Sequence, residues 1–292
     1  MSKIIFSHFA LFLANLIYAL NYIFAKDVMP EYISPTSFIF FRVMGGAIFF
    51  TIVHYFWVNE KVAKRDFLYL LICAVFGVVI NMLCFFEGLS ITSPINAALI
   101  MITTPLLVYI ISFCLSKKER SIRRFIGLIL GLLGAANLIS NGAMGFKIEN
   151  FGDFLIFINA LSYAIYLILV KKMMQKYHPI TILKTIFLIA TIIILPISSS
   201  GLSSFDVSIM PLPIIMKFFY VILFTTCFAY FLNIYALINL PSSTVAFYIY
   251  LQPLLATVFS LILGKDIITT MKLISAIFIF IGVYFVIEKR AI

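Results

Sequence analysis

Residues 67–86 read FLYLLICAVFGVVINMLCFF, a stretch that contains no charged side chain. A helix rises about 1.5 Å per residue, so about 20 apolar residues cross a hydrocarbon core about 30 Å thick. Inside a bilayer the backbone N–H and C=O groups have no water to bond, and a helix pairs all of them within one segment. This stretch therefore predicts a transmembrane helix.

Nine further stretches have a similar length and apolar character. The ten predicted membrane-spanning helices cover residues 5–25, 34–57, 67–88, 94–115, 122–141, 152–173, 179–199, 213–237, 243–263 and 270–287. Ser34, Ser93 and Ser243 are predicted N-caps, because a serine hydroxyl accepts a bond from the first helical turn. We therefore expect an all-α integral membrane protein with ten transmembrane helices.

The composition of the 292 residues agrees with a membrane protein: 64% are hydrophobic and 11% are charged. A soluble domain usually has about 25% charged residues. The net charge of +10 is divided among short clusters between the apolar spans. That distribution is typical of signals for membrane orientation and argues against a nucleic-acid partner. The lipid bilayer is the expected partner of most of the surface.

The basic residues predict the orientation of the chain. With the N-terminus inside and ten crossings, the inside loops hold fourteen basic residues: Lys3, Lys61, Lys64, Arg65, Lys117, Lys118, Arg120, Arg123, Arg124, Lys171, Lys172, Lys176, Lys289 and Arg290. The outside loops hold five: Lys26, Lys147, Lys217, Lys265 and Lys272. Loops on the cytoplasmic side carry the excess of Lys and Arg. We expect both termini in the cytoplasm and a multi-pass protein of the cell (plasma or inner) membrane.

Catalytic and metal-binding patterns are missing from the sequence. The four cysteines lie within apolar spans and show no zinc-binding spacing. The sequence has no HExxH, GxSxG or P-loop motif. We therefore expect no metal, no cofactor and no enzymatic activity, and any active transport would draw its energy from a gradient or from a partner ATPase.

The second half of the chain repeats the first. At a shift of 145 residues, residues 16–20 (LIYAL) align with 161–165 (LSYAI), and Lys26 aligns with Lys171. At a shift of 148, a second set of residues aligns: Ala98 with Ala246, Pro105 with Pro253, and Gly134 with Gly282. The sequence predicts two five-helix repeats, at residues 1–143 and 148–292. Because five is odd, the second repeat enters the membrane from the opposite side, and such inverted repeats are typical of secondary carriers.

Several of these residues also form a family pattern. The pattern comprises Tyr18-Ala19 with Lys26, Arg42, residues 85–89 (FFEGL) before Ala97-Ala98, Pro105-Leu106, and the glycines Gly127, Gly131 and Gly134. In this order the chain resembles the drug/metabolite transporter (DMT) superfamily, as an EamA-type permease. The resemblance implies a carrier, often an exporter of amino acids or other metabolites, with a central cavity between the two halves. Tyr18-Ala19 departs from the Trp-Gly that the family often has, and Ser275 and Ile279 stand where the first half has glycines.

Arg42 is the charged residue predicted to lie deepest. It follows Ser34 by eight residues, about 12 Å into the membrane. A charge at that depth is costly unless it faces a cavity, water or a partner. Glu87 is a candidate ion-pair partner and a candidate site for a coupling proton. The alternatives are a structural ion pair and snorkelling of the guanidinium to the headgroups.

The other candidate cavity residues are polar aromatics, amides and a hydroxyl within the predicted spans: Tyr18, Asn21, Tyr22, Asn81, Asn96, Thr104, Tyr163, Tyr166, Tyr230, Asn233, Tyr248 and Gln252. They offer stacking surfaces and hydrogen bonds with little fixed charge, which favours a neutral or zwitterionic organic solute. Tyrosines near span ends also serve as interfacial anchors, a role open to Tyr166 and Tyr250. Pro105 and Pro253 are candidate helix kinks around a midplane site, or passive bends.

These features predict a secondary-active carrier, an exporter, of a small organic solute such as an amino acid or metabolite, working by alternating access. The alternative is a membrane-embedded sensor, scaffold or lipid-handling protein on a transporter fold. The glycines of the fifth span and Ser275 and Gly282 of the tenth place small residues on helix faces. We expect them to pack within the chain, with a homodimer interface as the alternative.

Overall fold

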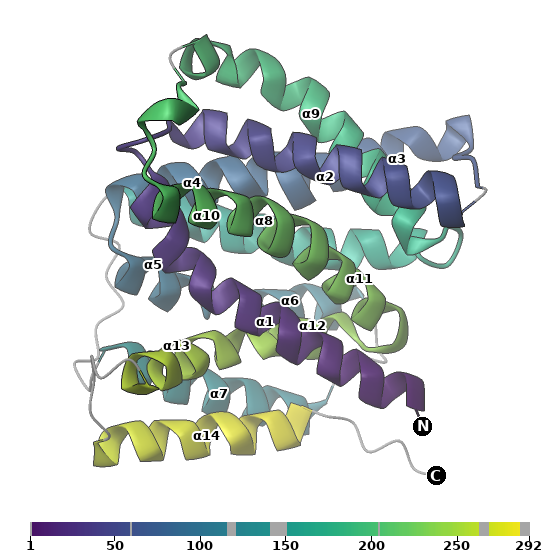
Figure 1. The fold of residues 1–292 in the computed structure, drawn as a ribbon. Helices are drawn as coiled ribbons and strands as arrows, with labels where there is room; N and C mark the ends of the chain where they lie inside the picture. Colours follow the sequence, from purple (N-terminus) through teal and green to yellow (C-terminus); the bar gives the residue numbers. More distant parts are fainter. Residues whose placement is uncertain are drawn as a thin grey trace.

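The computed structural model describes residues 2–58, 60–115, 121–140, 151–203, 205–262 and 269–286. In that part of the chain every regular element is a helix (Figure 1). Eight helical segments there are long and apolar enough to cross a membrane, and a shorter apolar helix covers Thr270–Val286. The all-helical membrane class predicted from the sequence is confirmed for these residues, whereas the count of ten crossings stays a prediction.

The helices follow the order of the predicted spans. The first half contains α1 (Ser2–Val28), α2 (Pro35–Trp57), α3 (Lys64–Ala74), η1 (Val75–Val79), α4 (Ile80–Ile91), α5 (Pro94–Met101), α6 (Thr104–Leu115) and α7 (Ile122–Ser140). The second half contains α8 (Phe151–Met173), α9 (Pro179–Ser203), η3 (Val207–Ile209), α10 (Leu212–Tyr220), η4 (Val221–Phe228), α11 (Ala229–Asn239), α12 (Ser242–Phe247), η5 (Tyr248–Tyr250), α13 (Leu251–Ile262) and α14 (Thr270–Val286).

Serine caps start two of these helices as predicted. Ser34 accepts a bond from the Ser37 N–H at 3.3 Å, and Ser93 accepts from the Asn96 N–H at 3.1 Å. A proline occupies the first turn of both helices, where a missing N–H costs nothing. The prediction of Ser243 as a cap was wrong. Its helix α12 begins one residue earlier, after Pro241, with no side-chain cap.

The two halves are interrupted at matching places. The third predicted span contains the π-helical η1 and the eighth contains the π-helical η4. The fourth span breaks at residues 102–103, between α5 and α6, and the ninth contains the 3-10 turn η5 between α12 and α13. Both pairs agree with the 148-residue shift of the sequence repeat. π-helical stretches occur frequently at functional sites.

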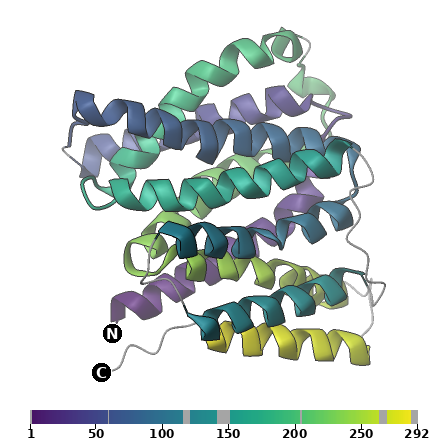
Figure 2. The ribbon, with the colours of Figure 1, turned by 180° about the vertical axis from the view of Figure 1, so that it is seen from behind.

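The packing partners also occur in matching pairs. Helix α1 packs on α11 and α8 packs on α4, while α2 pairs with α9 and α7 with α14. Figures 1 and 2 both show α7 and α14 lying side by side at one edge of the molecule. A Cβ added to Gly127 would lie 2.8 Å from the Gly282 carbonyl oxygen, and one on Gly134 would lie 2.7 Å from the Ser275 oxygen. The small residues therefore bring two helices of one chain together.

Two lysines at equivalent positions of the halves bind helix ends. The Lys26 ammonium, near the end of α1, donates to the carbonyl oxygens of Leu89 at 2.7 Å and Ser90 at 2.9 Å, at the end of α4. Lys171, near the end of α8, donates to the Leu240 oxygen at 2.7 Å, just after α11. Cations at helix C-termini satisfy orphan carbonyls and favour the helix dipole. The pair matches the shift of 145 residues.

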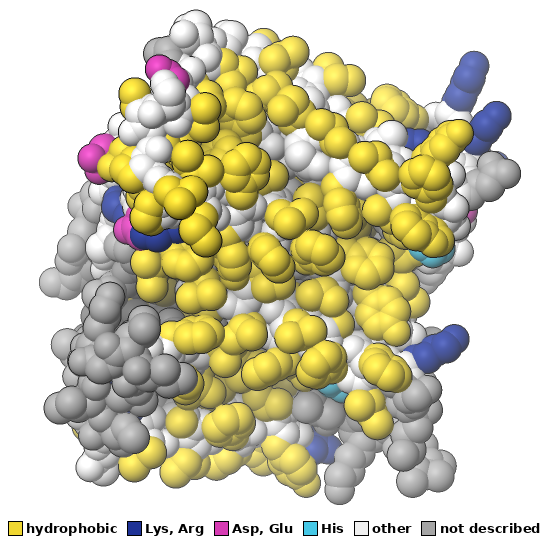
Figure 3. All heavy atoms as spheres, viewed as in Figure 1, with side chains coloured by type: hydrophobic (Ala, Val, Ile, Leu, Met, Phe, Trp, Pro, Cys, Tyr) yellow, Lys and Arg dark blue, Asp and Glu magenta, His cyan; other side chains and the backbone are white. Residues whose placement is uncertain are grey.

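An apolar belt separates two polar edges of the molecule. In Figure 3 hydrophobic side chains cover the middle of the face, several Lys and Arg side chains stand along the right edge, and acidic side chains lie at the left edge next to further basic ones. Ion pairs bridge the halves at both ends: Asp27 of α1 with Lys217 of α10 at 2.5 Å, and Asp66 of α3 with Lys176 after α8 at 2.7 Å. The belt is the surface expected to contact lipid.

Candidate functional site

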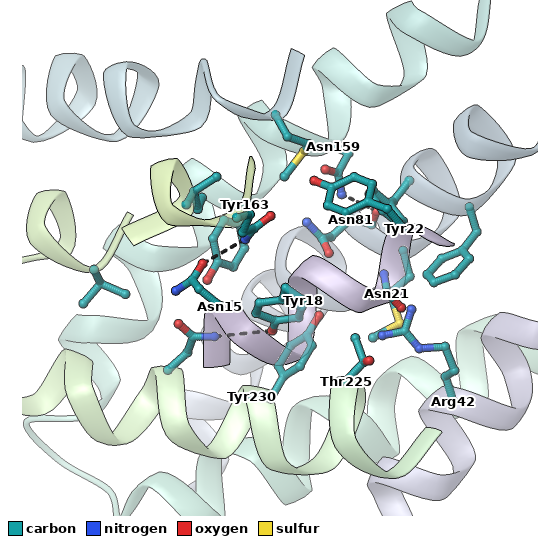
Figure 4. Close-up of a pocket in the computed structure, with 18 residues that line it drawn as sticks. Asn15, Tyr18, Asn21, Tyr22, Arg42, Asn81, Asn159, Tyr163, Thr225 and Tyr230 are labelled. Carbon is teal, nitrogen blue, oxygen red and sulfur yellow. Dashed lines mark hydrogen bonds between the residues drawn. The ribbon is translucent and has the colours of Figure 1, made fainter. Parts of the chain in front are cut away.

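A cavity lies between the two halves of the chain. We name it the central cavity and define it by eighteen lining residues: Asn15, Tyr18, Asn21, Tyr22, Arg42, Asn81, Met82, Phe85, Phe86, Met101, Asn159, Tyr163, Thr225, Tyr230, Asn233, Val245, Ile249 and Gln252. Its empty volume is about 690 Å³, including the space at its open mouth. Figure 4 shows polar side chains from several helices converging on this space. The mixed polar and apolar lining suits a small organic molecule.

Nine of the predicted site residues line the central cavity. They are Tyr18, Asn21, Tyr22, Arg42, Asn81, Tyr163, Tyr230, Asn233 and Gln252. Helix geometry accounts for the grouping on α1, where Tyr18 and Tyr22 are four residues apart and share one face. The two halves contribute through equivalent helices, because Tyr18 of α1 and Tyr163 of α8 are paired by the 145-residue shift.

Hydrogen bonds hold several of these side chains in place. The Gln252 amide donates to Asn15 Oδ1 at 2.9 Å, which joins α13 to α1. The Asn159 amide donates to the backbone oxygen of Asn81 at 2.6 Å, which joins α8 to α4. Asn233 donates to its own helix at Ala229 O, at 3.0 Å, and lies 3.4 Å from the Tyr18 hydroxyl. These side chains are thus held in place before any ligand binds, which lowers the entropic cost of binding.

Another hydrogen bond between the two halves ends on the backbone of a π-helical stretch. The Tyr230 hydroxyl donates to the backbone oxygen of Gly77, within η1, at 3.1 Å. A Cβ on Gly77 would lie 2.2 Å from Tyr166 Cδ2. Glycine at this position therefore lets the Tyr166 ring of α8 pack directly against the backbone.

Arg42 is almost completely buried, with 3% of its surface exposed. Its Nε donates to Thr226 Oγ1 at 2.8 Å, and its guanidinium lies 4.5 Å from the centre of the Phe86 ring. The predicted pairing with Glu87 is wrong, because the structure forms no ion pair between these two described residues. Snorkelling to the headgroups is also wrong, since other protein side chains cover Arg42.

Five predicted site residues lie outside the lining of the central cavity. Glu87 is half-buried near the end of α4, and Asn96 lies in the first turn of α5. The hydroxyl of Thr104 is buried and has no hydrogen-bond partner among the described residues. Tyr248 lies 2.7 Å from the imidazole of His8, near the start of α1.

The fifth residue, Tyr166, lies beside the central cavity in a smaller pocket that Tyr18, Tyr163 and Tyr230 also line. Only 2% of its surface is exposed, and Tyr250 is completely buried. The alternative of an interfacial anchor is therefore wrong for both tyrosines.

The two predicted kink prolines lie directly after the interruptions of their spans. Pro105 is the second residue of α6, and Pro253 is the third residue of α13. Both are buried and neither lines the central cavity. Proline has no N–H for a preceding carbonyl, which agrees with a helix that restarts at these points. Their role as kinks in the mechanism stays a prediction.

The sequence analysis missed three polar residues of the lining. Asn15 precedes Tyr18 by three residues on α1, and Asn159 precedes Tyr163 by four on α8, so both share a helix face with a predicted tyrosine. Thr225 precedes Tyr230 by five residues, a spacing that only the π-helical η4 brings to one side. The helical period could have identified Asn15 and Asn159. Thr225 could not be found in this way, because hydropathy does not predict a π-helical stretch.

The described residues contain no group of three His, Cys, Asp or Glu side chains that would hold a metal ion. Among the described residues that line the central cavity, Arg42 alone is charged. The remaining groups are hydroxyls, amides, aromatic rings and apolar side chains. This arrangement suits reversible binding of an organic molecule through stacking and hydrogen bonds.

Comparisons with known proteins agree with this architecture. The sequence profile of the EamA-like transporter family matches residues 5–140 and 150–288. An uncharacterized transporter of Archaeoglobus fulgidus is 28% identical over 289 residues, which cover 97% of this chain and 98% of the relative. The uncharacterized transporter YetK of Bacillus subtilis is 24% identical over 233 residues, which cover 78% of this chain and 70% of the relative. A solved crystal structure shares the fold, with a TM-score of 0.75, 15% identity and 96% of each chain covered.

Proposed function

Because this chain belongs to the EamA-like transporter family, we propose that it is a secondary-active carrier of a small organic solute, such as an amino acid or another metabolite. The central cavity carries this proposal. Its lining comes from both halves of the chain, so a relative movement of the halves changes access to it. The family resemblance favours export as the direction.

The proposed architecture has ten crossings in two inverted repeats, at residues 1–143 and 148–292. The paired π-helical stretches, the paired breaks in the fourth and ninth spans and the paired lysines Lys26 and Lys171 support it. The excess of basic residues on the inside loops supports cytoplasmic termini and a place in the cell membrane. Inverted repeats allow two conformations of similar energy that open to opposite sides.

In the proposed cycle the halves rock about the central cavity. Asp27 and Lys217 join them at one edge of the molecule, and Asp66 and Lys176 join them at the other. Opening toward one side separates the pair on that side and leaves the other formed. The exposed pair of Asp27 and Lys217 contributes only about 0–1 kcal/mol and breaks at little cost. Asp66 is more deeply buried, so its pair with Lys176 costs more to break.

The chemistry of the cavity suits binding better than catalysis, and we propose no enzymatic activity. A coupling proton is the open part of the mechanism. Glu87 was the candidate carboxylate, and its absence from the described lining of the central cavity weakens that role. A gradient of the solute or of another ion then supplies the energy.

Counterflow in proteoliposomes tests the proposal. Vesicles that contain the purified protein and an unlabelled solute are mixed with the same solute in labelled form, across a panel of amino acids, organic acids, nucleosides and sugars, with and without a pH gradient. We expect at least one solute to exchange. The variant Thr225→Trp, which fills the central cavity, should abolish exchange, while Ile52→Trp on the lipid-facing surface should retain it. Acceleration by the gradient would indicate proton coupling.

Silence of the wild-type protein across the whole panel, in vesicles with correctly folded protein, would contradict the proposal. It would favour the alternative of a sensor, scaffold or lipid-handling protein on the same fold. Equal exchange by Thr225→Trp and the wild type would leave the carrier role intact and would move the pathway away from the central cavity.

A further inference from the structure

We propose that the solute of the central cavity is an organic carboxylate and that Arg42 binds its carboxylate group. This inference rests on the proposed function and names the chemical class of the substrate. It narrows the sequence-based expectation of a neutral or zwitterionic organic solute to a solute that carries a carboxylate group.

The cationic side chain of Arg42 has no anionic partner among the described residues. A guanidinium offers five N–H donors, and in the structure only Nε makes a hydrogen bond, to Thr226. No carboxylate occurs among the described residues that line the cavity. A buried charge needs a partner of opposite sign or several hydrogen bonds to offset its lost hydration. The terminal nitrogens of Arg42 are therefore available to an anion inside the cavity.

Thr226 orients the guanidinium without neutralising it. The Thr226 hydroxyl donates to the Val221 oxygen at 3.2 Å, so its oxygen accepts the Nε–H of Arg42 at 2.8 Å. The Val221 bond spans five residues, the spacing of the π-helical η4. Phe86 packs against the guanidinium at 4.5 Å from its ring centre. The Thr226 hydroxyl and the Phe86 ring thus fix the orientation of the Arg42 guanidinium, and neither supplies a negative charge to compensate it.

The other lining residues indicate which groups the rest of the solute carries. Asn21 Oδ1, Asn159 Oδ1 and Thr225 Oγ1 are buried and have no hydrogen-bond partner in the described part of the chain. Figure 4 shows Asn21 and Thr225 on the side of the cavity to which Arg42 points. Unpaired buried acceptors favour a ligand that supplies N–H or O–H donors. The aromatic rings and methionines around them favour an apolar or aromatic body.

The ligand therefore carries a carboxylate, one or more hydrogen-bond donors and an apolar body. Both zwitterionic amino acids and monoanions such as N-acyl amino acids have these groups. A planar guanidinium binds a carboxylate through two parallel hydrogen bonds, which an ammonium does not reproduce. Arg42→Lys should therefore bind the solute more weakly than the wild type while keeping the charge.

Competition in the counterflow assay tests the inference. Labelled L-phenylalanine, L-leucine and N-benzoylglycine serve as probes, with uridine and glucose as probes without a carboxylate. For the carboxylate probe that exchanges best, the unlabelled acid and its unlabelled amide are then compared as competitors of the labelled probe. In the wild type we expect the acid to compete about 10- to 100-fold better than the amide, the effect of hydrogen bonds to a charged group.

Arg42→Gln should bring the acid and the amide to within about 3-fold of each other, and Arg42→Lys should fall between. Thr226→Val keeps the charge and removes the orienting hydroxyl, so it should weaken the preference for the acid even if Arg42→Gln fails to fold. A monodisperse elution profile in detergent confirms the fold of each variant. Faster exchange of the amino acids indicates a zwitterionic solute, and faster exchange of N-benzoylglycine indicates a monoanionic one.

Two outcomes would overturn the inference while the carrier role stands. One is exchange of uridine or glucose with no carboxylate exchanged by the wild type. The other is an unchanged acid-to-amide preference in both Arg42→Gln and Thr226→Val. If no probe exchanges and the wider panel is also silent, the proposed function itself fails, and the inference fails with it.

Discussion

Substituting alanine for Gly282 tests the close crossing of α7 and α14. A Cβ at this position would lie 2.7 Å from the Gly127 carbonyl oxygen and 2.9 Å from the Gly131 nitrogen. Both neighbours are backbone atoms, so no side chain can rotate away. The helices must separate by roughly 0.7 Å to bring the shorter contact to 3.4 Å, where ordinary contacts begin. Overpacking of this kind costs about 1–3 kcal/mol.

Alanine favours a helix over glycine by about 1 kcal/mol, so the net loss is about 0–2 kcal/mol. At about 2–4 °C per kcal/mol, the apparent melting temperature of Gly282→Ala in detergent should fall by up to about 8 °C. Fluorescence-detected size-exclusion chromatography after heating measures it. Gly45→Ala is the comparison, because its new methyl would meet one side-chain atom, Cγ2 of Ile222 at 2.6 Å, and no backbone atom. Gly45→Ala makes the same gain in helix propensity, so it should lose less stability than Gly282→Ala. A rise of about 2–4 °C in the melting temperature of Gly282→Ala, which is the full helix-propensity gain, would refute the crossing.

Three further substitutions test contacts between elements. Lys26→Met removes the cation from the end of α4 and should lower the melting temperature, whereas Lys61→Met on an exposed loop should not. Asp66→Lys repels Lys176 and should weaken thermal stability, and adding Lys176→Asp should restore part of the loss; a loss that the double variant does not recover would exclude the pair. Tyr230→Phe removes the bond to the π-helical backbone and should cost about 1 kcal/mol in the same assay; an unchanged melting temperature would show that water replaces this bond.

Hydropathy predicted the helices because the bilayer leaves the backbone few alternatives. The spans at 34–57 and 94–115 begin at Ser-Pro pairs, and the structure starts α2 and α5 at those prolines. The sequence does not predict the π-helical η1 and η4. A single extra residue per turn leaves the apolar pattern almost unchanged, and tertiary packing decides where it occurs.

The candidate site was predictable where polar residues repeat with the helical period. Tyr18, Tyr22 and Tyr163 belong to this class. The partner of Arg42 was not predictable, because residues 184 positions apart form that contact. Hydropathy likewise gives the depth of a residue without its rotation about the helix. Glu87 has a suitable depth, yet the two described residues form no ion pair, so depth alone does not predict which charges pair.

The central claim is that one cavity is reached from both sides of the membrane, and labelling of a single cysteine at position 21 tests it most directly. Asn21→Cys is built with the four native cysteines replaced by alanine, and Lys61→Cys marks one face as a control. A membrane-impermeant maleimide is applied to right-side-out and inside-out vesicles. The account predicts labelling of position 21 from both faces, slowed by the exchanged solute, and labelling of position 61 from one face. Labelling of position 21 from a single face under every solute gradient would contradict alternating access.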